Sequence, residues 1–194
     1  MRSIITLTAL AAVALASGCA HTINITPPLN TIPGDGITKV DKTVGYYISS
    51  EQKSLVVSTP GGGGDKVSYR PYADSEPALN QVLSNIYSSV VALAAPNDKA
   101  ELESKHVAYV FTPAITTTSH SSSALTWPPT NFTVTLDCKA TDGSGAAVWN
   151  QKVTGSGEAV YDDFKHDFSL AGRRASKDAF NQLQKALVAA PTLK

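Results

Sequence analysis

Apolar and polar residues alternate most regularly in the last third of the chain. A strand is predicted from Thr130 to Ala140, because every second residue from Phe132 to Ala140 is apolar, a period typical of a strand with one buried face. A second extended segment runs from Ala147 to Gly157, and Thr141-Asp142-Gly143-Ser144-Gly145 separates the two. Because Asp, Ser and Gly favour tight turns, the three segments together predict a β-hairpin.

Two longer segments repeat apolar residues every three or four positions, which is the period of an amphipathic helix. The first is predicted to begin after Ser75, a residue type that caps helices, and to stop before Pro96. Its apolar stripe consists of Leu79, Val82, Leu83, Ile86, Tyr87, Val90, Val91 and Ala94. The second helix is predicted from about Leu170 to Ala189 and is ended by Pro191. Both stripes are interpreted as core.

Three further segments are rich in β-branched and aromatic residues. Residues 42–49 and 54–59 are predicted to form a hairpin around a polar turn. A strand is also predicted from Val107 to Thr118, where Pro113 removes a backbone donor, so that this part is a sheet edge or bends at a bulge. The order of elements predicts an α+β fold: one mostly antiparallel sheet of about four or five strands, with two helices packed on one face.

The longest apolar run lies near the start of the chain. Arg2 precedes an almost unbroken apolar run from Ile4 to Ala16, which has the length of a signal-peptide core and is too short to cross a bilayer. Small residues then lead directly into Cys19. The segment Leu15-Ala16-Ser17-Gly18-Cys19 resembles the lipobox of bacterial lipoproteins. The resemblance implies that residues 1–18 are a cleaved signal peptide and that the thiol and new amine of Cys19 are acylated.

The residues after Cys19 bear on where the protein is anchored. Ala20 follows the cysteine instead of Asp, which in the lipoprotein family implies transfer to the outer membrane. Residues 19–41 contain several prolines and glycines, which favour extended chain. We therefore expect an extended tether there, with at most one edge strand, that holds a single domain over residues 42–190 away from the membrane. The alternative is an ordinary secretory signal in which the cysteine is incidental.

Charge is balanced, with 16 basic and 16 acidic residues. A nucleic-acid-binding protein usually has a basic face, so the composition argues against that class, and it gives no electrostatic reason to lie on anionic lipid. The second cysteine, Cys138, falls in the alternating strand on the apolar face with Phe132 and Leu136. We interpret it as a buried core thiol, not as a redox or metal-binding group.

The run Gly61-Gly62-Gly63-Gly64 is the densest group of glycines. A phosphate-binding loop needs Gly-Lys-Ser/Thr at the start of a helix, but Asp65 separates Gly64 from Lys66 and the following residues look extended. A nucleotide site is therefore rejected. Two interpretations stay open, a flexible surface loop and a loop that docks on a partner protein.

Other candidate chemistry is sparse. Four residues with ligand-type side chains lie together before the last helix: Asp162, Asp163, His166 and Asp167. They lack the spaced glycines of hard-metal loops and the further His or Cys of zinc sites, so a solvated linker is the better interpretation. Neither Gly143-Ser144-Gly145 nor Gly155-Ser156-Gly157 opens a helix as a nucleophile elbow does. No catalytic residue, metal or cofactor is predicted, and an enzyme is the least supported class.

Several of these features together resemble the YajG-type family of small periplasmic lipoproteins. They are the lipobox, an extended proline-containing segment, the strand at Val44-Gly45, the helix at Leu79-Val82-Leu83, the hairpin, and the closing helix with Asn181 and Leu183. A weaker resemblance, through Gly45-Tyr46-Tyr47-Ile48-Ser49, is to auxiliary lipoproteins of ABC-type lipid transporters. The glycine run and Trp127-Pro128-Pro129 depart from the YajG-type pattern, so no loop function is carried over.

Two functional hypotheses follow. The leading one is a non-enzymatic lipoprotein of the outer membrane, anchored through Cys19 and facing the periplasm, that acts as an accessory or adaptor of an envelope protein complex. It would dock through Gly61–Gly64 or through the exposed face of the sheet. The alternative is a lipid-binding auxiliary component of an envelope lipid transporter.

Overall fold

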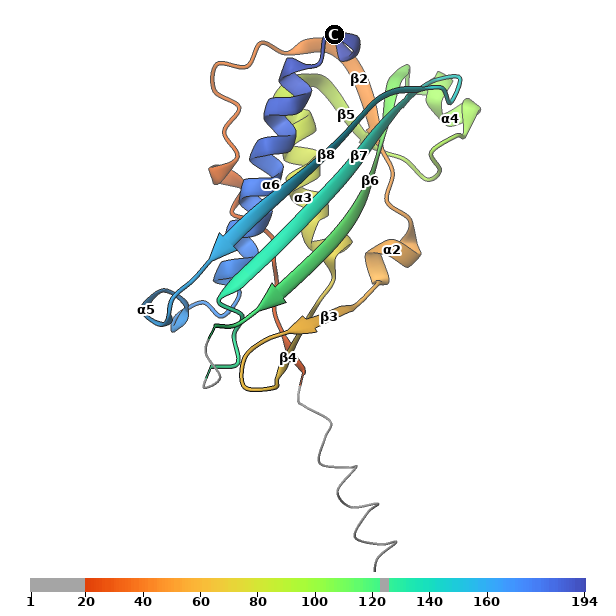
Figure 1. Ribbon diagram of the computed structural model, residues 1–194. Helices are drawn as coiled ribbons and strands as arrows, with labels where there is room; N and C mark the ends of the chain where they lie inside the picture. The colour runs from red at the N-terminus through yellow and green to blue at the C-terminus, as the bar shows by residue number, and fades with distance from the viewer. Residues whose placement is uncertain (1–19, 123–125) are drawn as a thin grey trace, which may run out of the picture.

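The computed structural model describes residues 20–122 and 126–194 (Figure 1). A five-stranded sheet in the order β5-β2-β6-β7-β8 is covered on one face by two long helices, α3 (Pro71–Ile86) and α6 (Leu170–Ala189). A three-stranded sheet in the order β1-β4-β3 lies at the end of the body where the described chain begins. The predicted α+β class, with two helices on one face of a sheet, is confirmed.

Both sheets are mixed. The strands of the larger sheet are β2 (Val40–Tyr46), β5 (Tyr87–Ala92), β6 (Val107–His120), β7 (Asn131–Asp142) and β8 (Ala147–Glu158). Strand β2 pairs in parallel with β5 and with β6, whereas β6, β7 and β8 form long antiparallel ladders. The β7–β8 hairpin is the one predicted from the alternating pattern.

The smaller elements connect these layers. The three-stranded sheet consists of β1 (Ala20–Thr22), β3 (Val57–Pro60) and β4 (Lys66–Tyr69), with β1 parallel and β3 antiparallel to β4. The short helical segments are α2 (Ser50–Ser54), α4 (Lys99–Ser104), α5 (Tyr161–Phe164) and the 3-10 turns η1 (Leu29–Thr31) and η2 (Pro191–Leu193).

The hairpin predicted from residues 42–49 and 54–59 is wrong. These segments become β2 and β3, which lie in different sheets, with α2 between them. Ser49 accepts a hydrogen bond from the backbone N–H of Gln52, and the Gln52 side chain accepts one from the backbone N–H of Ser49. This capping box satisfies donors at the start of a helix, so the polar segment forms a helical turn instead of a β-turn.

The first long helix is shorter and begins earlier than predicted. It begins at Pro71, where a fixed φ and a missing donor are tolerated, and it ends at Ile86. The rest of the predicted stripe, from Tyr87 onward, forms strand β5 beside β2. Aromatic and β-branched residues in this part favour a strand once a partner strand is available.

The predicted tether over residues 19–41 is wrong for its described part. Ile25 is completely buried, and Ile23 and Ile32 are almost so. The buried carboxylate of Asp74 on α3 accepts hydrogen bonds from the backbone N–H of Ile25 and from the side-chain amide of Asn24. Residues 20–41 therefore belong to the folded body, because their isoleucines bury apolar surface that an extended tether would leave in water.

Other expectations about the core hold. Helix α6 has the predicted bounds, and Cys138 is fully buried in β7. Helix α6 approaches β8 closely at two glycines: a Cβ on Gly155 would lie 2.2 Å from the Ala179 nitrogen, and one on Gly157 would lie 2.1 Å from the Ala171 oxygen.

Pro113 lies where the sequence allowed it. The described pairing of β2 with β6 ends at Phe111, and Pro113 is paired with β7 alone. The missing donor therefore faces the unpaired edge of β6 and interrupts no ladder.

Candidate functional site at the N-terminal end

The lipobox residues Leu15, Ala16, Ser17, Gly18 and Cys19 lie outside the described residues, so acylation of the cysteine stays a prediction. The described chain begins at the next residue, Ala20, which lies opposite Lys66 in the parallel pair of β1 and β4. One residue beyond β1, the backbone N–H of Ile23 donates to the Ser68 oxygen at 2.9 Å. The residue after the predicted lipid attachment point is thus already part of a sheet.

The glycine run lies at the same end of the body. It connects β3 to β4, and the backbone N–H of Gly61 donates to the Asp65 oxygen at 2.9 Å. The N–H of Gly62 donates to the Trp127 oxygen at 3.0 Å. Gly63 and Gly64 have positive φ and are exposed. The first half of the loop therefore packs on the body; docking of a partner on the exposed half stays a prediction.

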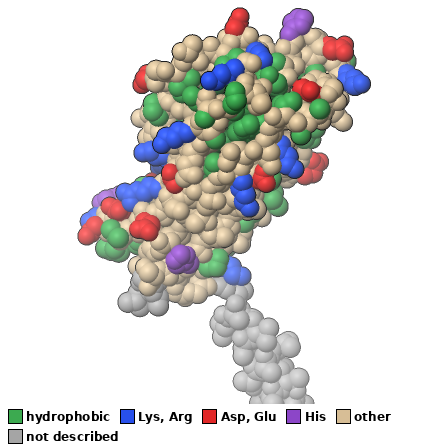
Figure 2. All heavy atoms as spheres, turned by 45° about the horizontal axis from the view of Figure 1, so that its top comes forward, with side chains coloured by type: hydrophobic (Ala, Val, Ile, Leu, Met, Phe, Trp, Pro, Cys, Tyr) green, Lys and Arg blue, Asp and Glu red, His purple; other side chains and the backbone are tan. Residues whose placement is uncertain are grey.

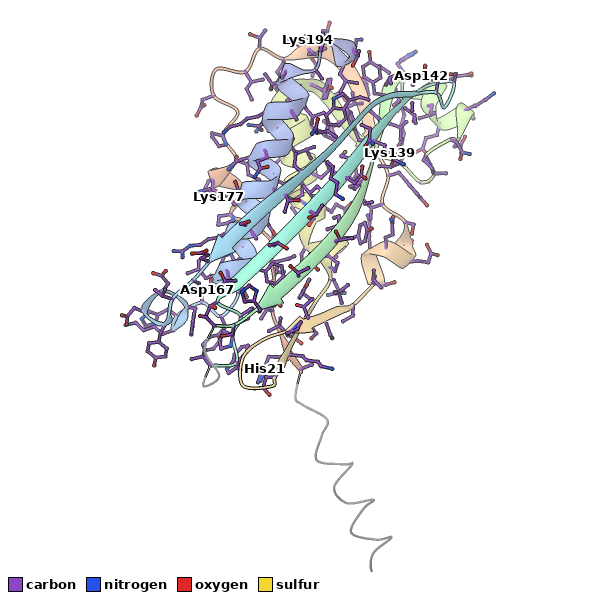
Figure 3. The ribbon with its side chains drawn as sticks, in the orientation of Figure 1. His21, Lys139, Asp142, Asp167, Lys177 and Lys194 are labelled. Carbon is purple, nitrogen blue, oxygen red and sulfur yellow. The ribbon has the colours of Figure 1, made fainter. Side chains whose placement is uncertain are left out.

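Three aromatic rings from distant parts of the sequence meet beside this loop. The ring of His21 stacks on Trp127 with centroids 4.0 Å apart, and Trp127 packs against Phe168 at 4.8 Å. The Nε2 atom of His21 also lies 3.4 Å from the Asp65 carboxylate. Figure 3 shows His21 at the end of the body where the described chain begins. The contacts of His21 therefore place Trp127 and Phe168 at that same end.

Exposed apolar side chains continue from this cluster toward α5. The side chains of Val160 and Tyr161 are 64% and 65% exposed, and Phe168 is 48% exposed. Val160 and Tyr161 border a cavity of about 290 Å³ that Thr126, next to Trp127, also lines. We call Val160, Tyr161 and Phe168, together with Trp127, which is partly buried against the core, the apolar rim.

Three of the acidic residues near the rim are held in ion pairs, whereas Glu158, which lines the same cavity, has none among the described residues. The pairs are Asp162 with Lys165 (3.2 Å), Asp163 with Arg174 (2.9 Å) and Asp167 with Arg173 (2.9 Å). The hydrogen bond from Arg174 lowers the pKa of the Asp163 carboxyl. Across the described part of the chain, no group of three or more His, Cys, Asp or Glu side chains is placed to hold a metal ion. These carboxylates fasten α5 and the start of α6.

Cys138, the one cysteine among the described residues, has an unreactive thiol. Burial, with a smaller contribution from Asp137, raises the pKa of the Cys138 thiol to about 12. The thiol therefore stays protonated at neutral pH, and the thiolate that redox or metal chemistry needs is not populated.

Sequence reasoning placed Cys19 and Gly61–Gly64 in separate roles and did not find the aromatic cluster. The structure places the glycine loop beside Ala20, and with it the rings of His21, Trp127 and Phe168. The sequence signal is that Trp127 and Phe168 are large apolar residues in connections between regular elements. That pattern does not indicate that the two connections meet.

No protein-family model and no curated protein matches the chain. Solved structures are similar to it at low identity. A Xanthomonas campestris protein assigned to the family model DUF330 is 14% identical, with 91% of this chain and 95% of that one covered and a TM-score of 0.49. PelC of Paraburkholderia phytofirmans, solved as a dodecamer of a point variant, is 17% identical, with 74% and 92% covered and a TM-score of 0.41.

A further similar structure is a Caulobacter crescentus protein described as a candidate lipoprotein, 14% identical, with 74% and 87% covered and a TM-score of 0.38. At this level of similarity no family is assigned to the chain. The resemblances to YajG-type and ABC-transport auxiliary lipoproteins stay predictions. None of the described helices is both long and apolar enough to span a membrane.

Proposed function

We propose that this chain is a bacterial lipoprotein, anchored by acyl chains on Cys19 to the periplasmic face of the outer membrane. In this proposal it acts without enzymatic activity, as an accessory or adaptor of an envelope protein complex. The observation that carries the proposal is that Ala20, the residue after the lipobox-like cysteine, is already paired in β1 at one end of the body. Acyl chains on Cys19 would hold that end against the bilayer without an intervening tether.

The anchor is energetically sufficient if the resemblance to lipoproteins holds. Each buried CH₂ of an acyl chain contributes about 0.8 kcal/mol, and stable anchoring takes more than one chain. Processing at a lipobox supplies acyl groups on both the thiol and the amine of the cysteine. A residue acylated in this way keeps a small domain on the membrane with no help from a spanning helix.

An open sheet face supports the adaptor role. The helices α3 and α6 cover one face of the five-stranded sheet, and no helix of the described residues covers the other face of β6, β7 and β8 (Figure 1). This face carries hydroxyls that bond to one another across strands, as between Thr118 and Thr133 (2.6 Å) and between Thr135 and Thr154 (2.9 Å). Figure 2 shows mostly uncharged polar side chains and backbone over the middle of the body. A broad polar surface of this kind suits a protein partner.

The side chains considered for catalysis have structural surroundings that support a non-enzymatic role. The Ser144 hydroxyl donates to the Asp142 carboxylate at 2.6 Å inside the β7–β8 turn. The backbone N–H of Ser156 donates to Asp178 on α6, which ties β8 to that helix. Both serines therefore belong to local structure.

The proposal is tested by affinity capture of the full-length protein from gently solubilised membranes, beside a Cys19→Ala control. Proteins and lipids in both samples are identified by mass spectrometry. We expect a specific envelope protein that is captured with the native chain and lost with the control. Tightly bound lipid without a protein partner would replace the adaptor proposal with the lipid-transport alternative, and capture of neither would refute both.

A further inference from the structure

We propose that the apolar rim (Trp127, Val160, Tyr161 and Phe168) inserts into the headgroup–acyl boundary of the bilayer that carries the Cys19 anchor. This inference rests on the lipid anchor of the proposed function and adds a second, protein-made contact with the membrane. The anchor fixes where the body is held, and the rim fixes which way it faces.

His21 lies close to the predicted anchor along the chain. His21 is two residues beyond Cys19 and therefore lies within about 7 Å of it, even if the chain between them is fully extended. The His21 ring stacks directly on Trp127, which in turn contacts Phe168. Trp127 therefore contacts a residue that lies only two positions after the anchor. An acylated Cys19 at the surface of a bilayer brings these rings to the same surface.

The side chains of the rim are apolar or aromatic. Val160 and Tyr161 have the largest exposed fractions among the large hydrophobic residues in the described chain, and Phe168 is also nearly half exposed. Water is an unfavourable environment for a group of such side chains. Trp and Tyr are the residues that favour the membrane–water interface, because their rings combine an apolar body with a polar atom. The rim has the composition that the boundary region of a bilayer accepts.

Charged side chains also lie near the rim. The carboxylates of Asp162, Asp163 and Asp167 near the rim are each paired with a Lys or Arg side chain. Pairing removes most of the repulsion from anionic headgroups and also leaves no strong attraction to them. We therefore expect the contact to depend on apolar insertion and to respond little to salt or to anionic lipid content.

The chain has a matched pair of probes for this inference. It contains two tryptophans, Trp127 in the rim and Trp149 on β8. Trp149 is paired with Ala140, nine residues along β7 from Asn131, which corresponds to about 30 Å at 3.3 Å per residue. Figure 3 shows the β7–β8 turn, marked by Asp142, at the far end of the body from His21. Trp149 therefore reports on protein that stands away from the membrane.

The test uses acylated full-length protein in phosphatidylcholine vesicles whose lipids carry bromine on the acyl chains. Trp149→Phe leaves Trp127 as the only tryptophan, and Trp127→Phe leaves Trp149. We expect the brominated lipid to quench most of the Trp127 emission and to leave Trp149 emission unchanged, at low and at high salt alike. The double variant Val160→Ser/Tyr161→Ser should weaken the quenching of Trp127, whereas Val188→Ser, an exposed site near the other end of α6, should not.

Acylation is read separately from the mass of the N-terminal peptide, so the two proposals can fail independently. Acylated protein whose Trp127 is no more quenched than Trp149 would overturn the rim contact and leave the anchor intact. Protein without acyl groups on Cys19 would overturn the anchor, and with it the inference. A third outcome is that a second copy of the acylated protein covers the rim. The protein would then self-associate, the Val160→Ser/Tyr161→Ser variant would not, and Trp127 would stay unquenched. This outcome would also overturn the membrane contact.

Discussion

Ala20 and Lys66 lie opposite each other in a parallel pair of strands, so the chain is part of the folded body from the residue that follows Cys19. A lipoprotein with a long flexible linker can hold its domain in many orientations and at many distances from the membrane. Here β1 begins at Ala20, so no linker separates the folded body from the predicted anchor at Cys19. The membrane, if Cys19 is acylated, becomes a neighbour of the β1–β4–β3 sheet.

Restoring a linker should release the body from the surface. A Gly/Ser insertion of about ten residues between Cys19 and Ala20 has a root-mean-square reach of about 17 Å. We expect the inserted protein to stay acylated and membrane-bound while quenching of Trp127 by brominated lipid falls. The same insertion in the β7–β8 turn, between Gly143 and Ser144, is the control and should leave the quenching as it was. Equal quenching with and without the linker would contradict the direct placement.

The N-terminal segment should contribute to folding as a core element does. Ile25 is fully buried against the body, so Ile25→Ala should lower the free energy of unfolding by about 2–5 kcal/mol. Leu29, four residues further on, is 39% exposed, and Leu29→Ala should cost much less. Urea unfolding of the two variants measures the difference. If both variants lost an equally small part of the free energy of unfolding, the segment would instead be a tether.

The glycine loop should be sensitive to a single methyl group at its packed position. A Cβ on Gly61 would lie 2.1 Å from the Trp127 oxygen, a backbone atom that cannot swing away. We expect Gly61→Ala to lower the free energy of unfolding by about 1–3 kcal/mol and to shift the Trp127 emission. Gly143→Ala is the matched control, because a Cβ there meets no atom within 4 Å. Wild-type stability of Gly61→Ala would mean that the loop is loosely attached.

The contact between Asp74 and the N-terminal segment predicts a pH dependence. Burial raises the pKa of the Asp74 carboxyl above its ordinary value of 3.8, against the hydrogen bond from Ile25 and the charge of Arg70. Between the ordinary and the raised value, the folded protein keeps a proton that the unfolded chain has lost. The contribution of Asp74 to the free energy of unfolding therefore decreases as pH rises through that interval.

Asp74→Asn removes this titration. The free energy of unfolding of the wild type minus that of Asp74→Asn should therefore fall as pH rises from just below 3.8, and should level off above the raised pKa. Urea unfolding at a series of pH values measures it. A difference that rises with pH would show that hydrogen bonds to the ionised carboxylate outweigh its burial.

Local patterns predicted the elements whose partners are close in sequence. The β7–β8 hairpin follows from strict alternation and a turn, and α6 follows from its helical period and Pro191. The segment from Tyr87 to Ala92 was wrongly predicted to be helical, because its apolar residues continue the helical period of α3. Its strand conformation depends on pairing with β2, whose residues lie more than forty positions earlier in the chain.

The candidate site shows the same division. The lipobox is a local motif and can be read from the sequence. The stack of His21 on Trp127 and the contact with Phe168 join three segments that no periodicity connects. The burial of Ile25 was also missed, because the prolines and glycines between residues 20 and 41 suggested an extended tether. The same residue types allow a segment to pack over the folded body, as this one does.

The most direct test of the account is the mass of the mature protein extracted from membranes of a Gram-negative host. We predict a chain that begins at Cys19 and carries acyl groups on its thiol and its amine, recovered with the outer membrane and retained there in high salt. A chain that begins at another residue and carries no acyl group, recovered from the soluble periplasmic fraction, would contradict the anchor and the placement of the body on the bilayer.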